Sequence, residues 1–501
     1  MSANAGSGKT KVLVDRIIRL LLEGVPSEHI LCLTYTKAAA SEMLVRLQKI
    51  INSWAIIAED ELQKQLEAIL EKKANIATIQ AARNLFFNFH DASLRLPILT
   101  IHSFCQGLLS NFPHEAGLNP AFKLANDEHM AELINMARIA ILAEAVTKPD
   151  EEWSKMLDYM LDNLSEHSFN QWVTKINSLR YKAQYLLQND DINDLAIHML
   201  YAKCDFEQGC ESSQLLQKYL TASDDFHAIL QNILPIFQSG SVNDGKMAQK
   251  IETYLCAEKT QSSLHDFAFA ILTNEGTQYK NVPTAPTKKK LLPKLSYEWA
   301  EISKRAEEYF KQYHMLNSVK LSHALMLVAK KWLTHYQAIK AQHSYVDYYD
   351  LLEKVHDLLQ DPELSNWVLY KLDSKITHLL IDEAQDTSGL QWKITQALTA
   401  ELFAGQGANG ISSLFVVGDE KQSIFGFQGA EAQQFMQQSL DYEARAAAIG
   451  EELHRVPLSV SFRSVATILQ FVDIVFANQG WEHQSFRGQQ NGRVCLHPCL
   501  D

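Results

Sequence analysis

The hydrophobic residues of this chain follow two different periods. Continuous apolar runs at residues 30–33, 379–381 and 414–417 have the length and the polar flanks of buried parallel strands. Elsewhere, apolar residues recur at helical spacing, as in the segment that follows Thr10. Because strand and helix signals alternate, the pattern predicts an α/β fold with a parallel sheet. Ligands are expected at the carboxyl ends of its strands.

The middle of the chain has a different character. From 126 to 342, amphipathic helical spacing dominates and glycine is sparse. We expect this segment to be a helical insertion that splits one α/β domain into two parts, residues 1–125 and 343–450. Residues 451–501 would then begin a second α/β domain. A chain of 501 residues is also longer than one hydrophobic core normally organises.

Two adjacent acids follow the apolar run at 379–381. At the carboxyl end of a buried strand, Asp382 can hold Mg²⁺ through water while Glu383 polarises an attacking water, as nucleotide hydrolysis requires. A strand that simply ends in two solvated acids has the same local sequence, so the pair alone leaves both interpretations open.

The first ten residues, MSANAGSGKT, resemble a P-loop. Gly6 and Gly8 let the backbone curl so that its amides point at phosphate oxygens, and the following helix adds its positive N-terminal end. Lys9 would then reach the β and γ phosphates, and Thr10 would ligate Mg²⁺. The strict pattern has glycine where this chain has Ala3, and only Met1 stands where a strand is expected. A glycine turn that caps a helix is therefore the alternative.

Further polar or aromatic residues follow other apolar runs. Gln422 could sense a γ-phosphate, and the aromatic rings of Phe425 and Phe427 could stack on bases of a single strand. The guanidinium of Arg463 could reach a phosphate. Taken alone, the two phenylalanines could equally be core residues, and Arg463 could equally form a surface ion pair.

Composition narrows the class of protein. The chain is 47% hydrophobic and 21% charged, as in soluble globular proteins. No apolar run reaches the roughly 18 residues of a membrane span, and the first residues lack a signal-peptide core, so we expect a cytoplasmic protein. The seven cysteines are scattered without the spacing of a zinc site, which favours reduced thiols. A net charge of −13 requires any contact with a nucleic-acid backbone to be local.

Taken in order, the motifs resemble those of superfamily-one, UvrD-like DNA helicases. The matching segments are NAGSGKT, LTYTKAAASEM, TIHSFC, DYYDLL, IDEAQDTSGLQW, VGDEKQSIFGFQGA and LSVSFRS. Within this family, the segments SANAGSGKT, FPHEAGLNPAF and FQGA are most similar to the AddA type, the helicase–nuclease subunit of bacterial double-strand-break repair. The motifs occupy both ends of the chain, whereas the helical insertion matches only in character.

This resemblance implies a RecA-like P-loop domain that uses ATP and Mg²⁺ to move 3′ to 5′ along DNA. It also implies single-stranded DNA and duplex ends as partners, together with an AddB-like subunit. By this resemblance, Asp382 would hold the metal and Glu383 would be the general base. Gln422 would couple the γ-phosphate to DNA, and Arg463 would touch the γ-phosphate. The implied nucleotide-binding residues are Ala5, Gly6, Ser7, Gly8, Lys9, Thr10 and Phe462, the last by stacking on adenine. The implied DNA-binding residues are Tyr35, Thr36, His102, Phe425 and Phe427.

The sequence departs from the family pattern in several places. No adenine-reading glutamine precedes the glycine turn, and Gln428 stands where relatives often have arginine. We expect the chain to be a fragment, because it stops at Asp501 before a second motor domain or a nuclease-like carboxylate cluster is complete. The arginine that stabilises the transition state in the family would then be missing. Such a contact is worth about 10³ to 10⁵ in rate, so we expect ATP hydrolysis by this chain to be slow.

Two other kinds of function stay open from the sequence. One is a non-catalytic remnant that binds nucleotide or a partner protein without turnover. The other is a P-loop ATPase unrelated to DNA, which would leave the segment DYYDLL and the pair Phe425 and Phe427 unexplained.

Overall fold

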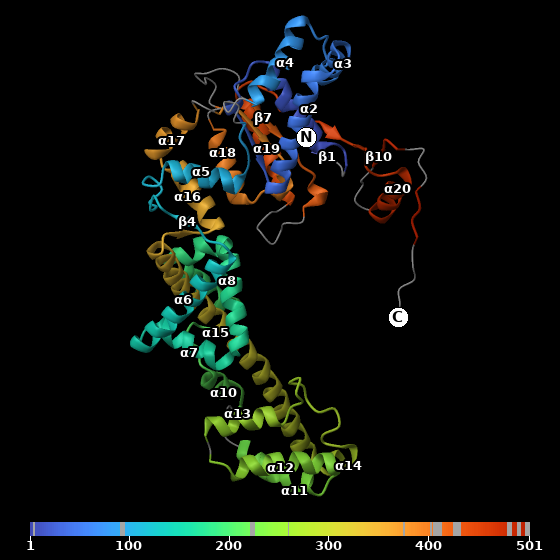
Figure 1. Cartoon of the computed structure of the whole chain (residues 1–501). Helices are drawn as coiled ribbons and strands as arrows, with labels where there is room; N and C mark the ends of the chain where they lie inside the picture. Colours follow the sequence, from blue (N-terminus) through green and yellow to red (C-terminus); the bar gives the residue numbers. More distant parts are fainter. Residues whose placement is uncertain are drawn as a thin grey trace. The chain divides into compact units, whose positions relative to one another are not determined.

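The structure is a computed structural model of the whole chain (Figure 1). The residues that it describes are 1–3, 6–90, 96–220, 226–258, 260–373, 376–400, 403, 413–423, 432–477, 483–487 and 492–495.

A four-stranded parallel sheet lies at the centre of the α/β part. Its order is β3 (Ile98–Thr100), β2 (Ile30–Thr34), β6 (His378–Ile381) and β7 (Ser413–Val416). Strands from the beginning and from the end of the chain therefore pair directly, as β2 and β6 do. The prediction of an α/β fold with a parallel sheet is confirmed.

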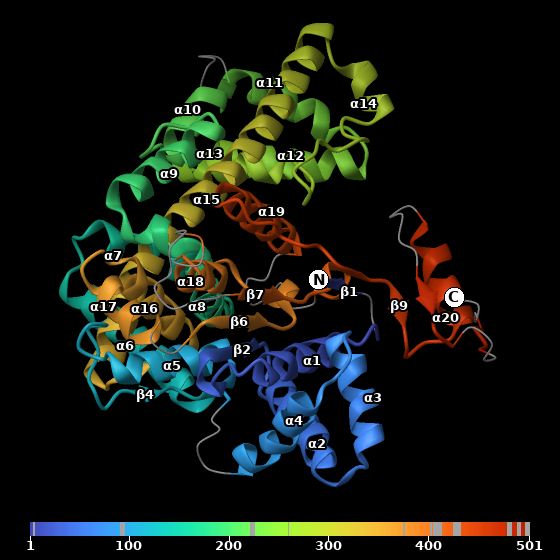
Figure 2. The same ribbon diagram turned by 90° about the horizontal axis from the view of Figure 1, so that it is seen from above.

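Helices cover both faces of this sheet (Figures 1 and 2). Ile30 and Cys32 of β2 join the core on one face, and Leu31 and Leu33 join the core on the other. Because both faces are buried, the strand reads as a continuous apolar run rather than an alternating one. The helices of the first core are α1 (Lys9–Leu22), α2 (Lys37–Ile56), α3 (Glu59–Leu70) and α4 (Ile76–His90). Those of the second are α5 (Ile101–Asn111), α16 (Tyr348–Gln360), α17 (Leu364–Asp373), α18 (Gly389–Leu398) and α19 (Ala432–Ala448).

A short strand precedes the glycine turn, which the sequence alone did not reveal. Strand β1 (Ser2–Ala3) pairs in parallel with β8 (Pro457–Leu458). Met1 links this pair to the central sheet, because its amino group donates to the carbonyl of Val416 at 2.6 Å and its carbonyl accepts from the amide of Gly418 at 3.2 Å. The glycine turn therefore follows a strand that lies beside β7.

Shorter elements complete this part of the chain. Strand β4 (Lys123–Leu124) pairs in parallel with β5 (Tyr345–Val346), and β9 (Val460–Ser461) pairs in parallel with β10 (Gln484–Ser485). The remaining helices are α20 (Ala466–Val475) and the short 3-10 helices η1 (Ser27–His29), η2 (Ala384–Asp386) and η4 (Glu420–Gln422).

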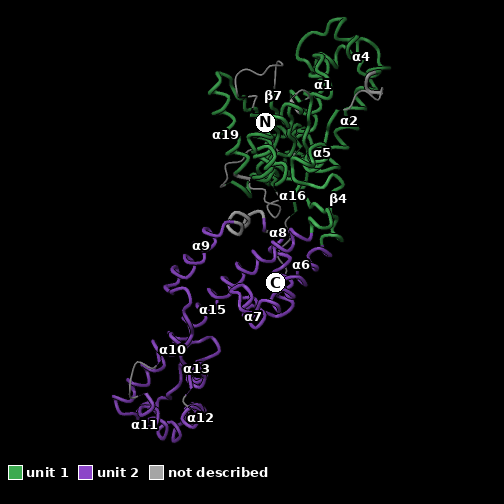
Figure 3. Tube along the Cα trace, turned by 90° about the vertical axis from the view of Figure 1, so that its left-hand side faces the viewer, with its two compact units in different colours: residues 1–130, 340–501 green, residues 131–339 purple. Residues whose placement is uncertain are grey.

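The chain divides into two compact units, residues 1–130 with 340–501 and residues 131–339 (Figure 3). The second unit is mainly helical, and its hydrophobic core includes Phe237, Ile251 and Trp299. Assignment of the predicted domains, including the boundary after 450, stays a prediction. The helices wholly or mostly in the second unit are α6 (Asp127–Thr147), α7 (Glu152–Asn163), α8 (Glu166–Gln188), α9 (Asp190–Lys203), α10 (Ser212–Leu220), α11 (Phe226–Gln238), α12 (Val242–Cys256), α13 (Gln261–Ala270), α14 (Ala285–Lys290) and α15 (Pro293–Gln342). Among the described residues, none of the helices is both long and apolar enough to cross a membrane.

Candidate nucleotide and nucleic-acid site

The glycine turn ends in the N-terminus of α1. Gly6 and Gly8 have φ of +72° and +87°, in the left-handed region that glycine adopts without a steric penalty. Gly8 is the N-cap of α1, and no side chain caps the helix there. The hydroxyl of Ser7 is buried without a hydrogen-bond partner among the described residues. This turn thus combines a helix N-terminus with a buried polar group, a combination suited to phosphate oxygens.

Phe462 and Arg463 lie directly beside this turn. The amide of Phe462 donates to the carbonyl of Gly6 at 2.9 Å. A Cβ added at Gly6 would lie 2.6 Å from the Cβ of Arg463, so only glycine allows this approach. The ring of Phe462 is half-exposed and packs 5.1 Å from the ring of Phe486. Two residues that the sequence places more than 450 positions after Gly6 are therefore its neighbours in space.

The two acids at the end of β6 face the same turn. Lys9 donates to Oε2 of Glu383 at 2.6 Å, across 374 positions of sequence. Asp382 is buried, and its amide donates to the carbonyl of Leu33 at 2.9 Å. Glu383 has a φ of +48°, which is uncommon for a residue with a side chain. The structure thus brings the P-loop lysine and the strand-end carboxylate into direct contact.

The surroundings of Asp382 suit a cation. Burial, and then the charge of Glu383, raise the pKa of Asp382 to about 6. A divalent cation would offset both effects, because its charge favours the ionised carboxylate. Among the described residues no group of three or more His, Cys, Asp or Glu side chains could hold a metal ion. Mg²⁺ typically binds one or two protein oxygens together with substrate phosphates, a mode that the buried carboxylate of Asp382 fits.

Residues 417–423, the segment after β7, contact the acids at the end of β6 through Gln385, a residue that sequence reasoning missed. Gln422 lies in η4, and its side chain donates to the carboxylate of Asp419. The buried amide of Gln385 contacts both Glu383 and the amide of Asp419. Gln385 belongs to the same motif as the two acids, but its burial and its bond to Asp419 depend on the approach of two strands and are not visible in sequence.

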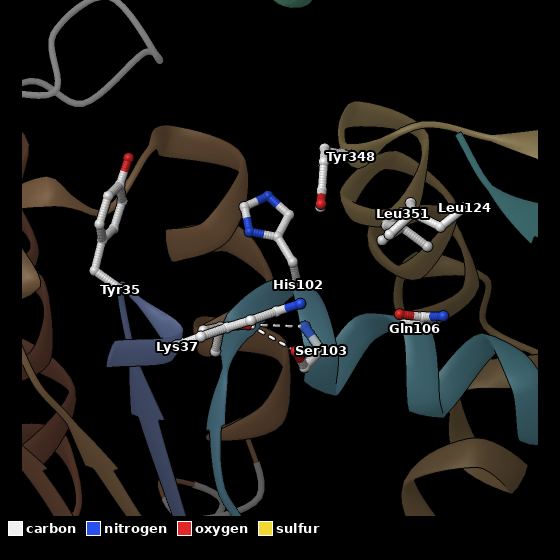
Figure 4. A pocket seen from close by; sticks show the side chains of 9 residues that line it. Tyr35, Lys37, His102, Ser103, Gln106, Leu124, Tyr348 and Leu351 are labelled. Atoms are coloured by element: carbon white, nitrogen blue, oxygen red, sulfur yellow. Dashed lines mark hydrogen bonds between the residues drawn. The ribbon is translucent and has the colours of Figure 1, made fainter. Parts of the chain in front are cut away.

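The ends of β2 and β3 border a second candidate site, a pocket of about 170 Å³ (Figure 4). Two residues predicted to bind DNA, Tyr35 and His102, line it together with Tyr348 from α16. The rings of His102 and Tyr348 pack edge to face at 5.3 Å. Lys37 and Gln106, which sequence reasoning also missed, supply a cation and an amide. Aromatic rings beside a cation are the groups that single-stranded nucleic acids contact.

Burial changes the proton affinity of two groups in this pocket. It lowers the pKa of His102, so the imidazole is neutral near pH 7. Burial, and then the charge of Asp386, raise the pKa of Tyr35 to about 12, so its phenol keeps its proton. Thr36 has a local structural role, because its hydroxyl caps α2 by accepting from the amide of Ala39 at 3.1 Å.

Some predicted residues lie outside the described part of the chain. These are Ala5 in the glycine turn and, after β7, Phe425, Phe427 and Gln428.

Comparison with known proteins agrees with this geometry. The UvrD/REP helicase N-terminal domain matches residues 1–258 and 246–443, which together are most of the chain. This chain belongs to the UvrD/REP helicase family. The resemblance predicted from the motifs is therefore confirmed. The roles of individual residues in this helicase stay predictions.

The chain is also similar to proteins that are named as the A subunit of an ATP-dependent helicase/nuclease. The protein from Lactobacillus johnsonii is 25% identical over 95% of this chain and 38% of its own length. The proteins from Latilactobacillus sakei subsp. sakei and Levilactobacillus brevis are 25% and 26% identical, over 53% and 37% of their lengths. The chain thus spans about 38% of the first of these relatives.

Proposed function

We propose that this chain is the ATP-binding front part of a helicase that moves 3′ to 5′ along single-stranded DNA. The observation that carries the proposal is the contact of Lys9 with Glu383, which unites the glycine turn and the strand-end acids in one site. A site for phosphoryl transfer needs positioning and charge stabilisation more than covalent chemistry, and these groups supply both.

In this proposal the phosphates of ATP lie against the glycine turn. The backbone amides near Gly6, Ser7 and Gly8 would contact phosphate oxygens, and Lys9 would leave Glu383 for the β and γ phosphates. Thr10 and Asp382 would hold Mg²⁺, which neutralises charge that develops on the transferred phosphoryl group. Glu383 would then accept a proton from the attacking water as general base.

Residues on either side of the glycine turn would complete the nucleotide site. The half-exposed ring of Phe462 can stack on adenine, and the exposed side chain of Arg463 can reach the γ-phosphate. Gln422 would sense the γ-phosphate from the segment after β7. The hydrogen bond between Gly6 and Phe462 supports this assignment, because it holds Phe462 and its neighbour Arg463 beside the glycine turn.

We assign the DNA strand to the pocket at the ends of β2 and β3. Its aromatic lining, from Tyr35, His102 and Tyr348, can stack on bases, while Lys37 can contact a phosphate. A neutral His102 would donate or accept a hydrogen bond rather than carry charge. Thr36, Phe425 and Phe427 stay in the proposal as further DNA contacts.

We also propose for this chain a role in the process that the name of the longer relatives suggests. Their name describes a helicase joined to a nuclease, which supports a role in recombinational repair of double-strand breaks. Duplex ends would be the substrate, and an AddB-like protein would be the partner. Such work takes place in the cytoplasm of a bacterium.

Linkage between the two ligands tests the proposal. We expect a non-hydrolysable ATP analogue with Mg²⁺ to change the affinity for a labelled single strand, by about 5- to 150-fold if the coupling is typical. Glu383→Gln should keep this effect, because a glutamine still accepts a hydrogen bond but cannot act as the base. A DNA affinity that does not change with nucleotide would contradict the proposal and favour an ATPase unrelated to DNA.

A further inference from the structure

The side chain of Gln385 is buried between the two strand ends of the nucleotide site. It is 2% exposed and lies in η2, directly after the acids at the end of β6. Its Nε2 donates to Oε2 of Glu383 at 2.7 Å and lies 3.4 Å from a carboxylate oxygen of Asp386. Its Oε1 accepts from the amide of Asp419 at 2.7 Å. One side chain therefore joins the predicted general base to the segment that follows β7.

The orientation of this amide is determined by chemistry. The backbone amide of Asp419 can only donate, so it must face the oxygen of the Gln385 side chain. The NH₂ group then faces the carboxylates of Glu383 and Asp386, which can only accept when ionised. The reversed orientation would place two donors together on one side and acceptors together on the other.

The two segments approach each other closely at this point. A Cβ added at Gly418 would lie 3.1 Å from Oε1 of Gln385 and 3.0 Å from the ring of Phe435. The hydroxyl of Ser423 donates to the carbonyl of Gln385 at 3.2 Å. Thus both the side chain and the backbone of Gln385 are bound to the segment that carries Gln422, the predicted γ-phosphate sensor.

Burial makes these contacts interdependent. If the segment after β7 moved away from Gln385, a buried amide oxygen would lose its hydrogen-bond partner, which is unfavourable. The side chain would therefore follow the segment, and the carboxylate of Glu383 would lose or change the hydrogen bond from Gln385, while Lys9 would still donate to it. The left-handed backbone of Glu383 fits this view, since such a conformation persists only where its surroundings fix it.

We propose that Gln385 is a positioning residue that transmits movement of the segment after β7 to Glu383, and thereby couples DNA binding to the nucleotide site. The inference rests on the proposed function and adds a route of regulation to it. Gln385 does not touch the reacting atoms. It sets the direction of the Glu383 carboxylate according to the position of Asp419.

The test measures the linkage between nucleotide and DNA in the whole chain with Gln385→Ala. For the unchanged chain and the variant, the affinity for a labelled single strand is measured with and without a non-hydrolysable ATP analogue and Mg²⁺. We expect the nucleotide-dependent change to fall below about twofold in the variant, from the 5- to 150-fold range of typical coupling. The affinity for each ligand alone should change less than about threefold, because Gln385 acts through Glu383 and touches neither ligand.

Two further variants separate coupling from folding. Gln385→Met has nearly the same length but can neither accept from the amide of Asp419 nor donate to Glu383, so it should also lose the linkage. Gln396→Ala is the control, because Gln396 makes an analogous, partly buried contact, at 2.6 Å to Gln438, away from the nucleotide site. It should keep the linkage of the unchanged chain. If Gln385→Ala fails to fold, Gln385→Met decides, because its side chain fills nearly the same volume.

The outcomes distinguish this inference from the proposed function. A Gln385 variant that keeps the linkage of the unchanged chain within twofold would overturn the inference and leave the proposed function intact. An equal loss of affinity for DNA and for the ATP analogue, with the linkage retained, would also overturn the inference, since that is the effect of a merely structural residue. Absence of linkage in the unchanged chain would contradict the proposed function itself, and this inference with it.

Discussion

At the scale of single residues, the nucleotide site depends on one contact between distant positions. Lys9 is 11% exposed at its side chain, and its ammonium lies 2.6 Å from Glu383. Lys11 stands only two residues later on the same helix, yet its side chain is 74% exposed and faces Asp15. The two lysines have the same charge and nearly the same sequence position. A comparison of their alanine variants therefore separates the effect of the contact with Glu383 from the effect of net charge.

Replacement of Lys9 should weaken nucleotide binding. We expect Lys9→Ala to lower the affinity for a fluorescent ATP analogue by about 10- to 100-fold, because charge-assisted hydrogen bonds are worth about 1.5–3 kcal/mol. Lys11→Ala should change it by less than about threefold, as expected for a screened surface charge. Equal losses in the two variants, measured by fluorescence titration, would show that Lys9 acts only through net charge.

At the scale of elements, the end of α15 and the start of α16 are joined by a buried ion triad. Lys340, 2% exposed, donates to Asp347 at 2.9 Å and to Asp350 at 2.7 Å. Asp347 is also the N-cap of α16, where it accepts from the amides of Tyr349 and Asp350. The triad therefore sets the position of the first turn of α16, which carries Tyr348 to the candidate DNA pocket.

Removal of the lysine should destabilise the unit that contains it. Lys340→Met leaves two buried carboxylates without their cation, and a broken buried pair costs about 3–5 kcal/mol of unfolding free energy. The exposed Lys49 of α2 offers a control, since Lys49→Met should stay within about 0.5 kcal/mol. Urea unfolding followed by circular dichroism measures both, and a loss below about 1 kcal/mol for Lys340→Met would contradict this role.

A buried aspartate of the helical unit should make its stability depend on pH. Burial alone would raise the pKa of Asp244, but hydrogen bonds from Thr284, Ser241 and Thr287 lower it well below its usual range. A lowered folded pKa stabilises the fold above the unfolded pKa of about 3.9, and that contribution is lost as the pH falls toward the folded pKa.

The matching variant is Asp244→Asn. It should lower the melting temperature at pH 7, and the difference from the unchanged chain should shrink between about pH 4 and pH 2. Thermal melts across this range give the comparison. A difference that stays constant with pH would mean that the charge of Asp244 contributes nothing.

These elements differ in how far sequence could predict them. Strands β2 and β6 were predictable because both of their faces are buried, which leaves a continuous apolar run. Strand β1 has two residues and no pattern of its own. The burial of Lys340 and Gln385 could not be predicted, because it depends on partners that the chain brings together only in the fold. Motif spacing found the acids and the glycine turn, but not the residue that joins them to the segment after β7.

At the scale of the whole molecule, the α/β unit is assembled from both ends of the chain. Residues 131–339 form a unit of their own between them, with a separate hydrophobic core. The glycine turn follows β1, which Met1 joins to the end of β7, and β7 pairs with β6, whose end carries the acids. We therefore propose that Lys9 and Asp382 serve one magnesium–nucleotide pocket.

A double-mutant cycle on the affinity for a non-hydrolysable ATP analogue with Mg²⁺ shows whether Lys9 and Asp382 act on the same bound group. The variants are Lys9→Ala, Asp382→Asn and the two combined, and asparagine keeps the oxygen that accepts from the amide of Glu383 at 3.0 Å. Because both side chains would act on the same bound group, we predict losses that are non-additive by about 0.5–3 kcal/mol. Losses that add within about 0.3 kcal/mol, or an unchanged affinity in either single variant, would contradict the shared pocket.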